Sequence, residues 1–145
     1  FGEHGDSSFI PWSVANISNV PISKCNELIS LPGMESPALN FDEIEQYVRK
    51  SGGRVIARKG ATFYAVSISV CHICKCLLAG IDTTMTVSTM MHGEYGIDDV
   101  CLSTLNLVGH DGIRGKVNVP LTDEETAKLR FSADTLKDVI KNLNI

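Results

Sequence analysis

Apolar residues recur at helical spacing in several stretches of the chain and alternate with polar residues in others. One helical stretch opens at Asn40, which forms a capping-box pattern with Glu43 three residues on. Another runs from Thr62, a candidate N-cap, to about Leu78 and ends at Gly80. These patterns predict two helices in the middle of the chain.

A pair of glycines interrupts the first of these helices. Gly52 and Gly53 each cost about 1 kcal/mol relative to alanine in a helix interior. The pair therefore marks either a kink or a place where something approaches the backbone closely. Gly60 is the expected end of this helix.

The two ends of the chain carry further helical patterns. Thr122 and Glu125 form a second capping-box pattern at the start of a terminal helix. The apolar stripe of that helix consists of Leu129, Ala133, Leu136, Ile140 and Leu143. Near the amino end we expect a short helix from Trp12 to Ile17, followed by a loop rich in Ser, Asn and Pro from Ser18 to Pro37.

Alternating or β-branched runs predict three strands. The first two are Met85 to Met91 and Val100 to Val108, with a turn region from Glu94 to Asp98 between them. A second turn at His110-Asp111-Gly112 leads into a third predicted strand, Lys116 to Val119. Three or four helices with an antiparallel hairpin or meander make this an α+β fold.

Length, composition and charge bound the fold class and the partners. A chain of 145 residues, 43% of them apolar, is long enough for one domain with its own core and too short for two ordinary ones. We therefore expect a single domain over residues 1–145, with helices packed on antiparallel strands. The net charge is −4, and Lys and Arg are scattered, which disfavours binding to nucleic acid or to an anionic membrane.

One segment, Gly60 to Ile81, is long enough and apolar enough to suggest a membrane span. Lys75 within it, several small polar residues and the lack of a basic flank favour a buried helix instead. The membrane alternative is the less favoured one.

The cysteines number five, at positions 25, 71, 74, 76 and 101. An odd number with three in one apolar segment favours reduced thiols, and no charged-then-apolar leader follows Phe1, so we expect a cytoplasmic protein. A structural zinc site usually needs ligands from two separate pairs, and no second cysteine pair exists. We therefore expect core thiols and no metal, with a thiolate site at Cys71, Cys74 and Cys76 as the alternative.

The glycine-rich stretch from Gly109 to Gly115 lies between predicted strands and does not open a helix. It therefore lacks the context of a phosphate-binding loop, and no G-x-G-x-x-G sequence occurs. The chain carries no nucleotide-binding fingerprint of its own.

The most specific chemical signal is the sequence Gly2-Glu3-His4-Gly5-Asp6-Ser7. Glycines on both sides of His4 allow a substrate to come close, and a histidine near neutral pH can give or take a proton. By itself, a histidine among Gly and Asp residues is more often a solvated loop residue than a catalytic one.

This segment resembles the active-site histidine motif of the NAD-dependent L-lactate dehydrogenases. The resemblance continues in the same order to the end of the chain, through Lys59–Thr62, Val87–Met90, Gly93–Ile97, Leu121–Glu125 and Ser132–Leu136. Related malate dehydrogenases share the fold, but their bacterial lactate-dehydrogenase-like members usually have Gly in place of Glu3. The resemblance therefore favours lactate over malate, with malate or another 2-hydroxyacid as the alternative.

The resemblance implies a role for four residues of this chain. His4 would protonate the carbonyl oxygen of pyruvate as NADH delivers hydride, and would take the hydroxyl proton of L-lactate in reverse. Thr62 and Gly52 would contact the substrate, and Val66 would pack beside the nicotinamide ring. For Gly52 and Gly53, a packed kink remains the alternative.

In this family the Rossmann cofactor domain precedes the histidine motif, together with two substrate-handling arginines and the aspartate that orients the histidine. None of these lies on this chain. We therefore expect the carboxyl-terminal, substrate-side portion of a homotetrameric dehydrogenase, cut just before its histidine. It would need the N-terminal NAD-binding portion for activity and would be inactive alone. The alternative is an autonomous α+β binding or assembly module without chemistry.

Overall fold

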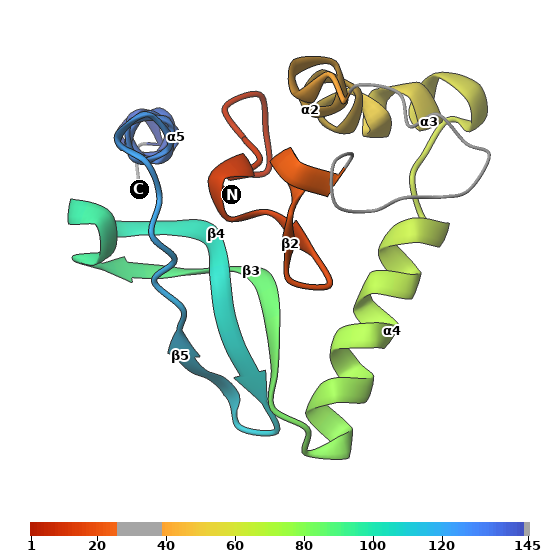
Figure 1. The fold of residues 1–145 in the computed structure, drawn as a ribbon. Helices are drawn as coiled ribbons and strands as arrows, with labels where there is room; N and C mark the ends of the chain where they lie inside the picture. Colours follow the sequence, from red (N-terminus) through yellow and green to blue (C-terminus); the bar gives the residue numbers. More distant parts are fainter. Residues whose placement is uncertain (26–38, 144–145) are drawn as a thin grey trace.

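A three-stranded antiparallel sheet forms the centre of the fold (Figure 1). The computed structural model describes residues 1–25 and 39–143. Strand β3 (Thr83–His92) pairs with β4 (Asp98–Gly109), and β4 pairs with β5 (Gly112–Lys116). The predicted α+β class and the first two predicted strands are confirmed, and both strands are longer than expected.

The third strand was misplaced by the sequence pattern. It begins at Gly112, which pairs with Gly109 across the two-residue turn His110-Asp111, and it ends at Lys116, where the predicted strand starts. Pairing resumes directly after the turn, where Gly112 follows the two turn residues with a positive φ of 91°, a position typical of glycine in such hairpins. The alternation after Lys116 therefore lies in irregular chain.

The core lies where helix α5 (Asp123–Asn142) packs on β4. Alternate residues of β4 from Val100 to Val108 are buried, as a strand with one covered face requires. The hydrophobic core cluster consists of Phe9, Met91, Ile97, Val100, Leu102, Leu129 and Ala133. The predicted stripe of α5 is therefore confirmed at its amino-terminal end.

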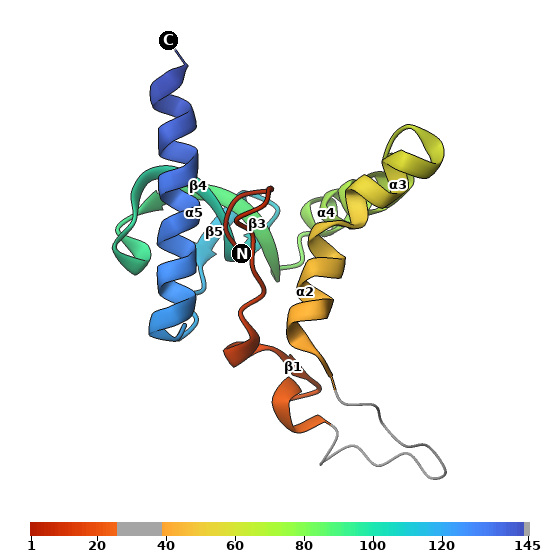
Figure 2. The ribbon, with the colours of Figure 1, turned by 90° about the horizontal axis from the view of Figure 1, so that it is seen from above.

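The other end of that stripe is exposed. Ile140 and Leu143 are 53% and 51% exposed, because α5 runs past the sheet at its carboxyl end (Figure 2). Helical periodicity marks a face of the helix, but the length of the sheet decides how much of this face is covered.

The amino-terminal segment lies between α5 and α2 (Phe41–Arg49) in both views (Figures 1 and 2). Of the helix predicted from Trp12 to Ile17, only Trp12–Val14 (η1) are helical, in a short 3-10 turn. A small hairpin follows, in which β1 (Asn16–Ile17) pairs with β2 (Val20–Pro21). The predicted helix is thus wrong beyond Val14, because Asn16 and Ile17 pair with β2 as a strand.

The predicted loop from Ser18 also contains structure. Its first part holds β2 and the 3-10 turn η2 (Ile22–Lys24), and Ser18 and Asn19 form the hairpin turn with positive φ. The stretch 26–37 of that predicted loop lies outside the described residues.

The predicted middle helix is two helices. Asn40 caps α2, since its side chain accepts a hydrogen bond from the backbone N–H of Glu43. The break falls at Lys50, and α3 (Ser51–Lys59) then carries Gly52 and Gly53 in its first turn. The glycine pair therefore does not itself form the break. The end at Gly60, with φ of 82°, is confirmed.

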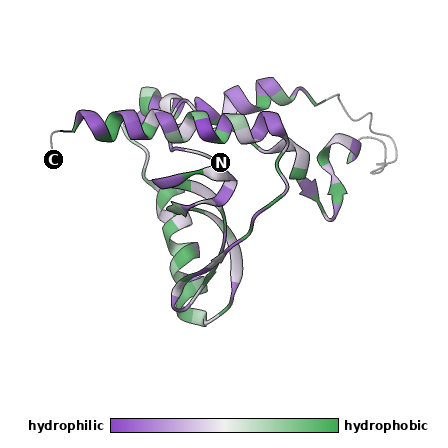
Figure 3. Ribbon diagram, turned by 90° about the vertical axis from the view of Figure 1, so that its left-hand side faces the viewer, coloured by the Kyte–Doolittle hydropathy of each residue, from purple (hydrophilic) through white to green (hydrophobic). Residues whose placement is uncertain are grey.

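Helix α4 (Tyr64–Ala79) ends at Gly80 as predicted, but Phe63 and not Thr62 occupies its N-cap, without a side-chain cap bond. The expectation of a buried helix is wrong for this chain, because no residue of α4 is buried. Ile68 and Leu78 are 71% and 89% exposed. Figure 3 shows α4 as a mostly hydrophobic helix, in contrast to the visible face of α5. No helix in the described parts of the chain is both long and apolar enough to cross a membrane.

A carboxylate connects α5 to the amino-terminal segment. The predicted capping box is confirmed, with Thr122 and Glu125 bonded reciprocally. The carboxylate of Glu125 also accepts hydrogen bonds from the backbone N–H, at 3.0 Å, and the hydroxyl of Ser13. Burial alone would raise the pKa of Glu125, but the hydrogen bonds outweigh it, so the pKa is lowered.

A second carboxylate stabilises the tip of the β3–β4 hairpin, where η3 (Glu94–Gly96) lies. Glu94 accepts the backbone N–H of His92 at 2.7 Å and pairs with Lys116 at 2.9 Å. The His92 N–H and then Lys116 lower the pKa of Glu94 to about 2. The charged form of Glu94 therefore stabilises the folded hairpin relative to the unfolded chain.

This shift predicts a pH-dependent loss of stability. Because the folded pKa of Glu94 is depressed from 4.5 to about 2, its contribution is present above pH 4.5 and is lost as the pH falls toward 2. We expect Glu94→Gln to lower the free energy of unfolding by about 1 kcal/mol at pH 7. The difference from the unsubstituted chain should shrink toward pH 2. Urea unfolding across this pH range measures it.

Glu124→Gln is the matched control, because the side chain of Glu124 is 80% exposed. Its one ion pair, with Lys128 at 2.9 Å, is an exposed pair one helical turn apart, so Glu124→Gln should lower the free energy of unfolding by no more than about 0.5 kcal/mol. An equal effect of both substitutions would contradict a special role for Glu94.

Candidate active site around His4

The loop that carries His4 is fixed to the sheet at its start. Gly2 and Ser103 of β4 exchange two backbone hydrogen bonds, of 3.0 and 2.9 Å. The terminal amino group of Phe1 donates to the carbonyl of Phe9 at 2.7 Å, and the N–H of Phe9 donates back to Phe1 at 3.1 Å. The two ends of the loop are thus joined, and His4 lies at its exposed turn.

Beneath the loop lies Ser132 of α5, which is fully buried. Its hydroxyl oxygen accepts the backbone N–H of Glu3 at 2.7 Å and lies 2.9 Å from the hydroxyl of Ser7. The carboxylate of Glu3 folds back over the loop and accepts from the hydroxyl of Ser7 at 2.6 Å and from its N–H at 3.2 Å. Both residues beside the histidine turn are therefore held by polar contacts.

Gly2 allows this close approach. It has a φ of 93°, and a Cβ atom there would lie 2.6 Å from Oγ of Ser132. A side chain at this position would therefore be strained in its backbone and would also collide with the buried hydroxyl.

Helix α2 holds the loop from the other side. The guanidinium of Arg49 donates to the carbonyl of Ser8 through Nε at 3.2 Å and Nη2 at 2.6 Å. Nη2 also pairs with Glu45, one turn earlier, at 2.8 Å. The orientation of the arginine is thus set before anything binds nearby.

A hollow of about 270 Å³ lies between the loop that carries His4 and helices α2 and α3. It is lined by His4, Gly5, Asp6, Ser8, Val48, Arg49 and Gly52. Two of the predicted site residues, His4 and Gly52, thus lie on one hollow although they are 48 positions apart in the sequence. A Cβ atom added at Gly52 would have no other atom within 4 Å, so this lining position borders open space.

The imidazole of His4 makes no hydrogen bond to any of the residues that the structure describes. An exposed imidazole at the mouth of a hollow can exchange a proton with a small molecule bound there. Asp6 lines the same hollow, but the structure gives no bond between its carboxylate and His4.

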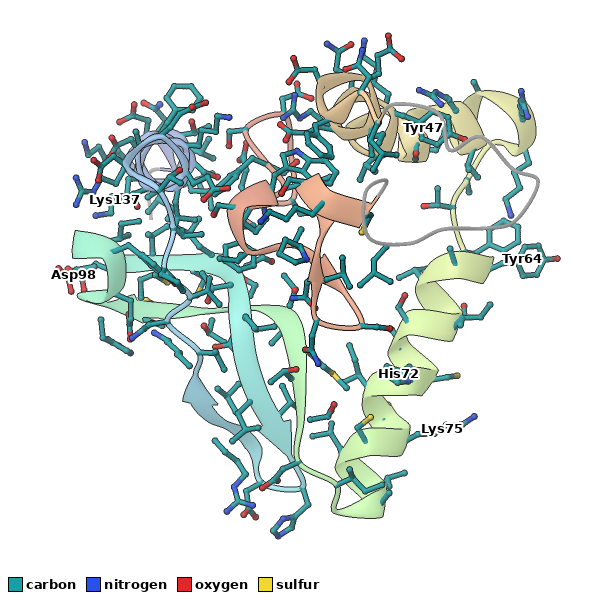
Figure 4. All side chains as sticks on the ribbon, in the orientation of Figure 1. Tyr47, Tyr64, His72, Lys75, Asp98 and Lys137 are labelled. Carbon is teal, nitrogen blue, oxygen red and sulfur yellow. The ribbon has the colours of Figure 1, made fainter. Side chains whose placement is uncertain are left out.

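The other two predicted residues lie elsewhere. Thr62 is exposed just before α4, and Val66, 53% exposed, lies in the first turn of α4. Neither lines the hollow at His4. The structure therefore divides the predicted site into a His4–Gly52 part and a Thr62–Val66 part. In Figure 4 the side chains of Tyr64 and Lys75 on α4 extend away from the sheet.

The cysteine cluster is not a core. Cys71 and Cys74 are exposed on α4, which contradicts their interpretation as core thiols. The residues of α4 that share a hollow with strand β3 are Ile68, Ser69, His72 and Ile73. Cys76 is half-buried, with its Sγ 4.0 Å from Nε2 of His72. The described residues contain no group of three or more metal-ligating side chains.

The sequence did not indicate that Arg49 and Ser132 belong to this site. An arginine in the last turn of a helix and a serine within one are ordinary residues in the sequence. Only the folded chain brings them against the loop, and a spacing of 129 positions between Glu3 and Ser132 leaves no local signal.

The chain matches known proteins over nearly its whole length. The model of the lactate/malate dehydrogenase alpha/beta C-terminal domain matches residues 1–144. This chain belongs to the lactate/malate dehydrogenase family. The L-lactate dehydrogenase of Thermoanaerobacterium saccharolyticum is 40% identical over 144 residues, which is 99% of this chain and 45% of that protein. That of Lactobacillus delbrueckii subsp. bulgaricus is 41% identical over 143 residues, 98% of this chain and 44% of that protein.

Solved structures of the lactate/malate dehydrogenase family have the same fold. The lactate dehydrogenase MGS-M5 from a Medee basin deep-sea metagenome library superposes with a TM-score of 0.90 at 26% identity, over 99% of this chain and 45% of that one. The malate dehydrogenase of Archaeoglobus fulgidus in complex with NADH gives a TM-score of 0.80 at 28% identity, over 99% and 42%. This chain therefore spans less than half the length of the family members it matches, and corresponds to their C-terminal half.

The contact at Gly2 predicts the effect of a single methyl group. We expect Gly2→Ala to lower the free energy of unfolding by about 1–3 kcal/mol, because it combines positive φ with a collision at Ser132. Urea unfolding of the two proteins measures the difference.

Gly53→Ala is the matched control, since nothing lies within 4 Å of the added Cβ in helix α3. There we expect a gain of up to about 1 kcal/mol from helix propensity. A loss of stability at Gly53 as large as that at Gly2 would show that the loop contact is not the cause.

Proposed function

We propose that this chain is the carboxyl-terminal, substrate-side domain of an NAD-dependent L-lactate dehydrogenase, in which His4 is the proton donor and acceptor. One observation carries the proposal: the imidazole of His4, without a protein partner in the described structure, lies at a hollow whose other wall includes Gly52. Relatives named L-lactate dehydrogenase, at about 40% identity over the whole chain, support the reaction class.

In this proposal each predicted residue has a defined part. His4 protonates the carbonyl oxygen of pyruvate and, in reverse, takes the hydroxyl proton of L-lactate. Gly52 leaves room for the substrate beside the histidine, and Thr62 contacts it from the segment before α4. NAD, when bound, supplies the hydride chemistry.

The residues of this chain fit one wall of a nicotinamide site. Val66 is 53% exposed on the first turn of α4, so its apolar side chain is accessible to a flat ring. The chain shows no phosphate-binding loop, and the rest of the cofactor site belongs to the N-terminal portion in this proposal.

Malate dehydrogenase is the competing assignment, because a solved structure of one superposes well. Two features favour lactate. The relatives at about 40% identity are named L-lactate dehydrogenase, and Glu3 occupies the position before the histidine. Comparing turnover of pyruvate and oxaloacetate by the full-length protein separates the two.

The exposed helix α4 supports a larger assembly. Its side chains Val66, Ile68, Val70 and Leu78 are each more than half exposed. Large apolar side chains exposed together on one helix mark an interaction surface. We propose that the N-terminal portion and other copies in a cytoplasmic homotetramer cover this surface, with α4 in the contact.

Replacement of His4 tests the catalytic proposal. In the full-length protein we expect His4→Asn to lower the rate of pyruvate-dependent NADH oxidation by about 10²–10⁴-fold, because a positioned acid typically contributes this much. The fold should be unchanged, since the imidazole is exposed. Absorbance of NADH and an unfolding curve on the same sample measure both.

If the chain is instead a non-catalytic assembly module, neither the unsubstituted protein nor His4→Asn should show turnover. The substitution should also leave the oligomeric state and partner binding unchanged. The isolated 145-residue chain should also lack turnover, because in this proposal both arginines and most of the cofactor site are elsewhere. Cofactor-dependent turnover by the verified isolated chain would contradict this division of labour.

A charge on α4 tests the assembly proposal. We expect Ile68→Asp, at a side chain 71% exposed, to reduce the assembly to smaller species, because a buried unpaired carboxylate is costly. Ile113→Asp on β5, at a side chain 47% exposed, is the matched control and should leave the mass unchanged. Analytical ultracentrifugation of the full-length proteins distinguishes the two. An unchanged mass for the α4 variant would exclude it from the interface.

A further inference from the structure

Ser132 is a fully buried hydroxyl on a helix whose neighbouring buried residues, Leu129 and Ala133, belong to the hydrophobic core. A buried hydroxyl is costly unless it is hydrogen-bonded. The partners of Ser132 outside its own helix are Glu3 and Ser7, the residues on either side of the turn that holds His4. This polar group in the core is therefore directed at the loop.

The directions of these hydrogen bonds follow from the number of protons. The carboxylate of Glu3 only accepts, so the hydroxyl proton of Ser7 is used in the 2.6 Å bond to it. The 2.9 Å contact between the two hydroxyls must then use the proton of Ser132. Ser132 thus donates to Ser7 and accepts from the N–H of Glu3 at 2.7 Å.

The chain of bonds fixes the loop at two points that flank the histidine. The N–H of Glu3 is bound directly to α5, and Ser7 is bound through the same oxygen. Gly2 has no side chain and so allows the loop to lie against Ser132, since a Cβ atom there would be 2.6 Å from that hydroxyl oxygen. Motion of the oxygen of Ser132 would therefore be transmitted to the backbone on both sides of His4.

We propose that Ser132 is a positioning residue, which through Glu3 and Ser7 sets where the imidazole of His4 stands relative to the substrate. The role of His4 is that of the proposed function, on which this inference rests. Ser132 does not touch the hollow at His4. Its effect is therefore on the transition state and not on the affinity for substrate, since a proton donor displaced by about 1 Å can cost 10²-fold in rate.

Three serine and threonine variants of the full-length protein test the role. Ser132→Ala removes the central hydroxyl, and Ser7→Ala removes the second one from a half-buried position where the fold is not at risk. Thr135→Ala is the matched control, because the hydroxyl of Thr135 donates only within α5, to Phe131 at 2.9 Å.

We expect Ser132→Ala to lower kcat about 10- to 100-fold with KM for pyruvate within about twofold, and Ser7→Ala to act in the same direction with a smaller effect. Amide hydrogen exchange in residues 3–7 should become about tenfold faster in both, because the bonds holding the loop are lost. Thr135→Ala should change neither quantity.

The exchange measurement makes the two proposals separable. If the unsubstituted full-length protein reduces no pyruvate, the proposed function fails, and the role of Ser132 in that reaction fails with it. In an active protein, unchanged exchange or an unchanged kcat in Ser132→Ala overturns the positioning role alone. A rise in KM equal to the fall in kcat/KM also overturns it, because that pattern reports lost binding.

Discussion

The contact between Gly2 and the buried hydroxyl of Ser132 is the constraint on which the site depends. It joins the first residues of the chain to the last helix, and it requires both a glycine with φ of 93° and a small polar side chain below it. The contact therefore needs both residues, Gly2 and Ser132. The loop lies on α5 because Gly2 has no Cβ, and the core accepts a serine there because the loop satisfies its hydroxyl.

Two further ties keep the amino-terminal segment between its neighbouring helices. Arg49 binds the loop to α2 through the carbonyl of Ser8, and Glu125 binds the 3-10 turn at Ser13 to the cap of α5. Both ties use a charged side chain bonded to backbone groups, and such hydrogen bonds are stronger than neutral ones. The histidine turn is therefore the exposed tip of a segment that is anchored along its length.

Helix α4 differs from the rest of the structure because its apolar residues are exposed. Most residues of α4 are apolar, as in an interior helix, yet none of them is buried within this chain. The predicted site is divided in the same way, with His4 and Gly52 on the anchored part and Thr62 and Val66 beside the exposed helix. In the proposed dehydrogenase, the surface that completes the assembly and the surface that completes the active site are thus neighbours.

Local patterns determined the elements of this protein. Capping residues, αL glycines and alternating strands act within a few positions, so the starts of α2 and α5, the ends of α3 and α4 and the first two strands could be predicted from the sequence. The histidine motif could likewise be recognised because its residues are adjacent in the sequence. Errors arose where pairing overrode the pattern, as at Ile17 and at the third strand.

Tertiary structure alone decided what surrounds each element. Hydrophobicity predicted a buried α4 and core thiols, but burial depends on which surfaces meet, and the sheet meets only one side of that helix. In the same way, the meeting of His4 with Gly52 and of Glu3 with Ser132 spans 48 and 129 positions. The sequence by itself determined the histidine, the caps and the strands, because these depend on neighbours along the chain. The hollow and its supports depend on neighbours in space, which no local spacing encodes.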